Sequence, residues 1–202
     1  MSKLGVSMIV LNEPADRLAM LVEYVKAFAD QVVIADTGSA INEVELYKTW
    51  GVDAYDYRWT DDFAAARNST LDHFRDDIEW ILHLDGDELP SWQMVNALLW
   101  IKDNAPSKVK GYQFWTQNYW GGVVGGSAPY HWHCRLFRRK HGRWYKKVHE
   151  QVQINGIREE QAHSRGWLVH ATQDAYLIHS KPQETMDRAN EVYSRIGEGP
   201  RP

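Results

Sequence analysis

The first half of the chain alternates between short apolar runs and amphipathic stretches. The segments Val6–Leu11 and Gln31–Ala35 are the buried-strand type of run, and apolar residues recur at helical spacing from Leu18 to Phe28 between them. The alternation continues with a helix over Glu43–Trp50, a strand over Val52–Tyr57, a helix from about Asp62 to Phe74 and a strand over Trp80–Leu84. Strands and helices in this order predict a parallel sheet with helices on both faces. Asp61 or Asp62 is the expected N-cap of the third helix.

The second half has a different pattern. After a predicted helix over Ser91–Asn104, strands joined by Gly-containing turns are expected at Tyr112–Trp120, Tyr130–Arg138 and Trp144–Ile154. The Gly-rich stretch Gly121–Ser127 predicts a mobile loop, and an amphipathic helix is expected from about Glu184 to Ile196. We therefore expect a single α/β domain over residues 1–202 with a β-rich second half and a terminal helix.

Composition narrows the class of protein. The chain has 202 residues, of which 44% are hydrophobic and 25% charged, as in globular proteins. Its formal charge of −4 gives no overall positive field for a nucleic acid. No run approaches the roughly 18 apolar residues that a membrane helix needs. With the single cysteine Cys134 and no recognisable export signal, these features predict a cytoplasmic protein without an integral membrane segment.

Polar clusters follow three of the predicted strands. They are Asn12–Glu13, Asp36–Ser39 and Asp85–Glu88. Ligands of open α/β sheets bind beyond the carboxyl ends of the parallel strands, so we expect all three clusters on one ligand-binding rim.

The carboxylates of Asp85 and Asp87 carry the strongest chemical signal. Gly86 between them allows both side chains to turn toward one hard cation, and Mg²⁺ or Mn²⁺ prefers oxygen ligands with positions left for phosphate. The alternative is an acidic turn that caps the next helix.

Taken together, six segments resemble the family-2 glycosyltransferases of GT-A fold, and in particular their bacterial and phage branch. The segments are Ser7–Glu13, Asp36–Ser39, Asp61–Asn68, Trp80–Glu88, Cys134–Arg138 and Lys147–Gln151. The resemblance implies a GT-A (Rossmann-like), mostly parallel sheet flanked by helices. It also implies a nucleotide-sugar half over residues 1–104 and an acceptor-side half over residues 105–202.

The resemblance also implies roles for the donor side of the site. Asn12, Glu13 and Asp36 would hold the base and ribose, and Arg67 would lie near the base or diphosphate. Asp87 would be the direct metal ligand, with Asp85 shared between ribose, sugar and metal-bound water. An ordinary surface ion pair with Asp61 or Asp62 is the alternative for Arg67.

His149 and Glu150 follow as candidates on the acceptor side. The imidazole of His149 would contact the metal or the diphosphate, and Glu150 would act as general base. Two adjacent strand residues can serve one site only if a bend turns one of them. The alternative for Glu150 is a cross-strand pair with Lys146 or Lys147.

The expected function is therefore an inverting, Mn²⁺- or Mg²⁺-dependent transfer of a hexose from a UDP-linked or other nucleoside diphosphate sugar. The acceptor hydroxyl could belong to a saccharide, a protein or a modified nucleobase. The other candidates are a nucleotidyltransferase, which would want a Gly-rich basic loop near the N-terminus, and a non-catalytic carbohydrate-binding protein using the ten tryptophans. A zinc site at His131, His133, His141 and Cys134 lacks a second ligand pair.

Overall fold

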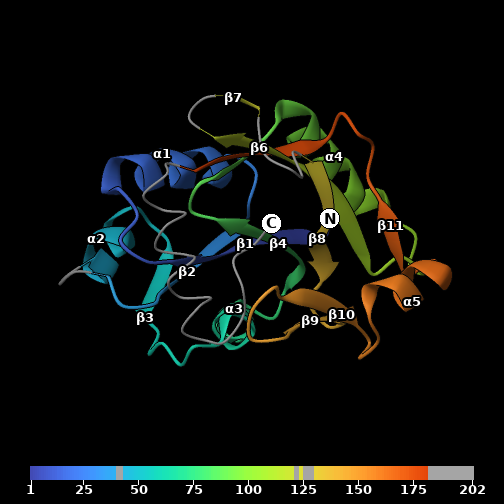
Figure 1. The fold of residues 1–202 in the computed structure, drawn as a ribbon, viewed down its shortest axis with the longest axis horizontal. Helices are drawn as coiled ribbons and strands as arrows, with labels where there is room; N and C mark the ends of the chain where they lie inside the picture. The colour runs from blue at the N-terminus through green and yellow to red at the C-terminus, as the bar shows by residue number, and fades with distance from the viewer. Residues whose placement is uncertain (40–42, 121–122, 125–129, 182–202) are drawn as a thin grey trace.

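The computed structural model describes residues 1–39, 43–120, 123–124 and 130–181 (Figure 1). The predicted terminal helix over Glu184–Ile196 lies outside the described residues. Most of the predicted mobile loop over Gly121–Ser127 does too, although Val123–Val124 form the two-residue strand β7.

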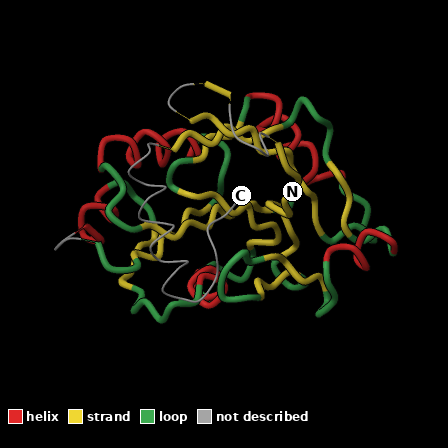
Figure 2. The backbone as a smooth tube through the Cα atoms, viewed as in Figure 1, coloured by secondary structure: helices red, strands yellow, loops and turns green. Residues whose placement is uncertain are grey.

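One large mixed sheet runs through the molecule and appears as the long yellow band of Figure 2. In the described residues the strand order is β3 (Asp53–Asp56), β2 (Gln31–Asp36), β1 (Lys3–Val10), β4 (Ile78–Asp85), β8 (Tyr130–Arg138), β6 (Gly111–Trp120), β12 (Tyr176–Lys181) and β5 (Glu88–Pro90). Strands β1 to β4 are mutually parallel, and the antiparallel β8 joins β4 to β6. Strands β7 and β11 (Leu168–His170) also pair with β6. The predicted parallel sheet is therefore confirmed for the first half.

Two layers cover the faces of this sheet (Figure 1). Helices α1 (Ala15–Lys26) and α4 (Trp92–Asn104) bury their apolar residues in one core cluster, on one face. Helix α3 (Phe63–Leu71), the hairpin β9–β10 (Gly142–Tyr145 and Gln151–Ile154) and helix α5 (Glu159–Ser164) contribute to a second cluster on the opposite face. Helix α2 (Glu43–Thr49) packs against β2 and β3. We call the side of the sheet that carries α3, the hairpin and α5 the α3 face.

Local sequence explains the element boundaries. All six residues of β2 are buried, as expected of a strand covered on both faces. The Asp62 carboxylate accepts the Ala65 N–H at 2.8 Å and caps α3, and the Ser91 hydroxyl accepts the Met94 N–H at 3.1 Å and caps α4. The prediction of a cap at Asp61 or Asp62 is thus confirmed at Asp62.

The single strand predicted over Trp144–Ile154 is wrong. The chain forms the two short strands of a hairpin there, because Lys146 and His149 adopt positive φ angles of 70° and 50° and interrupt the extended backbone. Both are non-glycine residues, which seldom adopt this conformation, so no local signal marked the turn.

No helix in the described ranges is long and apolar enough to cross a membrane.

Candidate active site

The turn after β4 places its acidic residues beside the end of β1. Strands β1 and β4 are paired up to Ile9 and Asp85, so Asn12–Glu13 and Asp85–Glu88 emerge at the same edge. A Cβ on Gly86 would lie 2.8 Å from the Glu13 Cγ. A Cβ at position 86 would therefore force the Glu13 side chain to shift, and the predicted meeting of these two clusters is observed.

Glu88 fixes the shape of this turn. Its Oε2 accepts the Asp85 N–H at 2.9 Å, and its Oε1 forms an ion pair with the Arg135 guanidinium. Both side chains are buried. Burial raises the pKa of the Glu88 carboxyl above its usual value, although the positive charge of Arg135 acts in the opposite direction. The sequence pattern did not single out either residue as a partner of the other.

Arg135 reaches Glu88 because of an irregularity in β8. The register with β6 shifts at this point: Tyr112 pairs with Leu136, whereas Gln113 pairs with Cys134. Arg135 is the extra residue of this bulge, and bulges of this kind re-aim a side chain.

Arg67 joins the predicted base Glu150 to the predicted donor-side residue Asp85. From α3 it donates through Nη1 to the Asp85 Oδ1 at 2.9 Å and through Nε to the Glu150 Oε1 at 2.8 Å. The side chain is only 6% exposed, and its guanidinium lies 5.1 Å from the centre of the Trp144 ring. Burial alone would lower the pKa of Arg67, but the two carboxylates outweigh it and raise the pKa above its ordinary value. Arg67 is thus a buried bridge and not a surface partner of Asp61 or Asp62.

A neutral histidine lies beneath this bridge. His83 is fully buried on β4, with its Nε2 3.3 Å from the Asp85 Oδ1 and its Nδ1 3.3 Å from the Ser7 Oγ. Burial, and next the charge of Arg67, lower its pKa well below the ordinary value. The ring therefore supports Asp85 without adding a positive charge.

His149 and Glu150 lie in the turn between β9 and β10. The positive φ of His149 supplies the bend that two adjacent residues need to serve one site. Glu150 is buried, and its Oε1 is held by Arg67. Its carboxylate therefore belongs to the same hydrogen-bonded group as Asp85, which is where a candidate general base is expected.

Asp87 faces a residue that the sequence pattern did not reveal. Its Oδ1 lies 3.3 Å from the His179 Nε2, and the other ring nitrogen of His179 lies 2.8 Å from the Asn118 Oδ1. If Nδ1 donates to Asn118, the neutral ring presents the Nε2 lone pair to a carboxylate. Such a contact needs a proton or a cation between the two atoms. His179 was missed because β12 was not predicted; the apolar run Tyr176–Ile178 was the available signal.

The donor set near Asp87 fits a divalent cation. Mg²⁺ is commonly held by one or two protein carboxylates together with substrate phosphates. In the described part of the chain, no three His, Cys, Asp or Glu side chains form a ready metal cluster, which also gives no support to the zinc alternative. Asp87 and His179 are the pair that would hold the ion, with remaining positions for oxygen atoms of the ligand.

The predicted nucleotide end forms a connected loop pair. Asp36 ends β2, and its Oδ1 accepts the N–H groups of Gly38 at 2.9 Å and Ser39 at 2.7 Å. The Asn12 N–H donates to the Ser39 hydroxyl at 2.7 Å, which ties the end of β1 to this loop. The Asp36 Oδ2 is buried and has no hydrogen-bond partner among the described residues. Burial and the Asp36 charge raise the pKa of the nearby Tyr47 phenol above its ordinary value.

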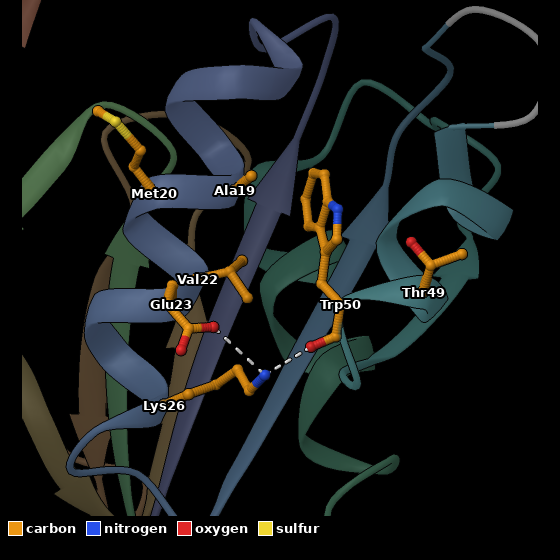
Figure 3. A pocket seen from close by; sticks show the side chains of 7 residues that line it. All are labelled: Ala19, Met20, Val22, Glu23, Lys26, Thr49 and Trp50. Atoms are coloured by element: carbon orange, nitrogen blue, oxygen red, sulfur yellow. Dashed lines mark hydrogen bonds and ion pairs between the residues drawn. The ribbon is translucent and has the colours of Figure 1, made fainter.

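A separate pocket of about 460 Å³ lies between α1 and the end of α2 (Figure 3). Its polar feature is Lys26, whose Nζ donates to the Trp50 carbonyl at 2.7 Å and lies 3.5 Å from the Glu23 carboxylate. None of the predicted site residues lines it.

Comparison with known proteins identifies the fold. No family model matches the chain. A TPR repeat-containing protein of Synechococcus elongatus is 26% identical over 182 residues, which are 89% of this chain but only 42% of that relative. Mannosyl-3-phosphoglycerate synthase from Rubrobacter xylanophilus has a similar structure, with a TM-score of 0.60, 12% identity and coverage of 97% of this chain and 72% of the synthase.

A second similar structure is glucosyl-3-phosphoglycerate synthase from Mycobacterium tuberculosis in complex with Mn²⁺, UDP and glucosyl-3-phosphoglycerate. Its TM-score is 0.54 at 12% identity, with coverage of 98% of this chain and 81% of the synthase. Together with the helix-covered, mostly parallel sheet, these likenesses show that the chain has a GT-A, Rossmann-like fold.

Proposed function

We propose that the protein is a metal-dependent glycosyltransferase that moves a hexose from a UDP-linked sugar to an acceptor hydroxyl with inversion. One observation carries the proposal: Arg67 binds Asp85 and Glu150 together at the carboxyl end of β4. This arrangement brings the predicted donor-side carboxylate and the predicted base into one hydrogen-bonded group. It does so in a GT-A fold and at the sheet edge where ligands of such folds bind.

The donor nucleotide would lie along the ends of β1 and β2. The buried Asp36 Oδ2 is an acceptor without a hydrogen-bond partner among the described residues, and an N–H group of the base would satisfy it. Asn12 and Glu13 border the same loop pair and would hold the base and ribose. Uracil can supply such a group through its N3–H.

The diphosphate end would lie at the turn after β4. Asp87 and His179 would hold Mn²⁺ or Mg²⁺ there, and Asp85 would contact the ribose, the sugar or a metal-bound water. His149, in the nearby turn, would contact the metal or the diphosphate. When bound, the ion would neutralise the charge that develops on the departing diphosphate.

Glu150 would take the proton from the acceptor hydroxyl. As the hydroxyl oxygen bonds to the anomeric carbon, the bond from that carbon to the diphosphate oxygen breaks, and the hydroxyl proton passes to the carboxylate of Glu150. A single displacement of this kind inverts the anomeric centre. Arg67 keeps Glu150 in place through the Oε1 atom.

Titration calorimetry with UDP, with and without Mn²⁺, tests the proposal. We expect UDP binding that depends on Mn²⁺ and whose affinity falls at least ten-fold in Asp87→Asn. In a second assay, the unaltered protein should slowly release UDP from UDP-glucose, UDP-galactose or UDP-N-acetylglucosamine. Glu45→Gln removes an exposed carboxylate of α2 and should change neither result.

Two outcomes would overturn the proposal. Binding of a nucleoside triphosphate with release of pyrophosphate would make the protein a nucleotidyltransferase. Binding of saccharides with no affinity for any nucleotide would make it a carbohydrate-binding protein.

A further inference from the structure

An aromatic cluster outside the donor region lies on β6, β8, β11 and α5. We define it by Trp115, Trp132, His163 and His170. The Trp132 and His170 rings are stacked at 4.4 Å with 5° between their planes. Trp115 meets Trp132 edge-on at 5.0 Å, and His163 meets His170 edge-on at 4.5 Å. Three strands and a helix are thus joined by one continuous set of rings.

Strand direction places this aromatic cluster toward the same edge of the sheet as the Asp85 turn. The pairing of β4 with β8 ends at Leu82 and Leu136. Because β8 runs antiparallel to β4, the first part of β8, which includes Trp132, lies toward the edge at which β4 ends with Asp85.

The aromatic cluster also shares a face with the candidate base. Side chains alternate along a strand, so Trp132 lies on the same side as Cys134, which belongs to the core cluster of the α3 face. Trp115 pairs directly with Trp132 and therefore lies on that side too. Arg67 and Glu150 come from α3 and the β9–β10 turn, the elements that cover this face.

A partly buried chain of hydrogen bonds anchors the aromatic cluster. The Gln113 Oε1 lies 2.6 Å from the His163 Nε2, and the Gln113 Nε2 donates to the Glu159 Oε2 at 2.5 Å. The other Glu159 oxygen accepts the Val152 N–H at 3.1 Å, two residues after Glu150 in the chain. The rings are therefore positioned relative to the strand that begins beside the candidate base.

The outer part of the aromatic cluster is accessible to a ligand. Gln113 is buried, whereas Trp115 and Trp132 are half-buried and His170 is exposed. Flat apolar ring surfaces thus lie next to imidazole groups that can exchange hydrogen bonds.

We propose that this aromatic cluster is the acceptor subsite and that the acceptor is a saccharide. The C–H face of the sugar ring stacks on the tryptophans, and its hydroxyls bond to the imidazoles. One of these hydroxyls then points toward Glu150. The inference rests on the proposed glycosyltransferase function and adds the class of its acceptor.

Saturation-transfer NMR on the full chain with UDP and Mn²⁺ tests the proposal. The probes are the methyl glycosides of glucose, galactose and N-acetylglucosamine. Nucleosides other than uridine are the competitors. We expect saturation of ring protons for at least one glycoside. His170→Ala, a change at an exposed position, should weaken that binding at least five-fold, and Trp132→Ala at least ten-fold. The affinity of both variants for UDP with Mn²⁺ should stay within two-fold.

Trp100→Ala is the matched control, since Trp100 is 60% exposed on α4 and belongs to the opposite face. It should change none of these values. Normal UDP binding without saturation of any glycoside, or saturation of nucleosides instead, would overturn the acceptor proposal and leave the glycosyltransferase proposal standing. If the unaltered protein does not bind UDP, the glycosyltransferase proposal itself is overturned. If Trp132→Ala does not fold, the glycoside signal of the unaltered protein and the effect of His170→Ala still decide.

Discussion

Arg135 and Glu88 form a buried ion pair across 47 positions of sequence, and the same carboxylate accepts the backbone N–H of Asp85. The metal-side turn is therefore held by β8, a strand of the second half of the chain. Because Arg135 has little access to water, its charge depends on the Glu88 carboxylate that it contacts directly for most of its compensation.

Glu88→Gln should destabilise the protein strongly. The amide can still accept the Asp85 N–H, but Arg135 is left with an uncompensated buried charge, which costs about 3–5 kcal/mol when a buried pair is broken. Urea unfolding at pH 7 measures the loss. Glu79→Gln breaks the matched ion pair with Arg138, in which Glu79 is 43% exposed, and should cost less than about 1 kcal/mol. Equal losses in the two variants would contradict the importance given to the buried pair.

Arg67→Lys should abolish most transfer activity while the fold is retained. A lysine keeps the positive charge but has no planar fork, so it cannot donate to Asp85 and Glu150 at the observed positions together. We expect kcat to fall at least 100-fold, within the 10²–10⁴ range that a positioned general base contributes. Steady-state kinetics and UDP titration separate the effects. A fall in UDP affinity alone, with kcat unchanged, would show that Arg67 serves only the donor.

Local signals explain which parts of this architecture the sequence predicted. Continuous apolar runs and helical periodicity were enough for β1 to β4 and α1 to α4, since each element buries its own face. The polar ends of β1, β2 and β4 followed from the parallel order. The cap at Asp62 is equally local, because its side chain bonds to an N–H three residues ahead.

The partners of the site residues depend on long-range folding and could not be predicted. Arg67 and Glu150 are 83 positions apart, and nothing in the sequence around either residue predicts a contact with the other. The same holds for His179, which meets Asp87 only because β12 enters the sheet between β6 and β5. The resemblance to glycosyltransferases brought Asp85, Arg67 and Glu150 to one site, but not the bonds among them.

The neutral state of His83 should make the protein less stable as the pH is lowered. Its pKa in the folded protein is well below the ordinary value of 6.5, so the unfolded chain binds a proton more readily. The contribution is complete above pH 6.5 and is lost as the pH falls below it, by up to about 1.4 kcal/mol per pH unit.

Urea unfolding at pH 7, 6 and 5 measures this slope. His83→Gln keeps an amide that can face Asp85 but removes the titrating ring, so the variant should be less stable at pH 7 and show a flatter slope. His73→Gln, at an exposed ring stacked on Tyr55, is the control and should keep the slope of the unaltered protein. Identical slopes in His83→Gln and the unaltered protein would exclude His83 as the source.

His179 and His149 should respond differently when the metal is varied. His179→Ala removes a nitrogen that lies 3.3 Å from Asp87, so we expect the Mn²⁺ concentration for half-maximal UDP binding to rise at least ten-fold. His149→Ala should raise the KM for the donor with a smaller change in that Mn²⁺ requirement, if its ring contacts the diphosphate. Electron paramagnetic resonance of Mn²⁺ titrated into each variant with UDP gives the comparison. A larger loss of Mn²⁺ in His149→Ala would assign the ion to the β9–β10 turn in place of β12. Asp87 would then bind the ion together with a residue from the acceptor side of the site, and the contact with His179 would be structural.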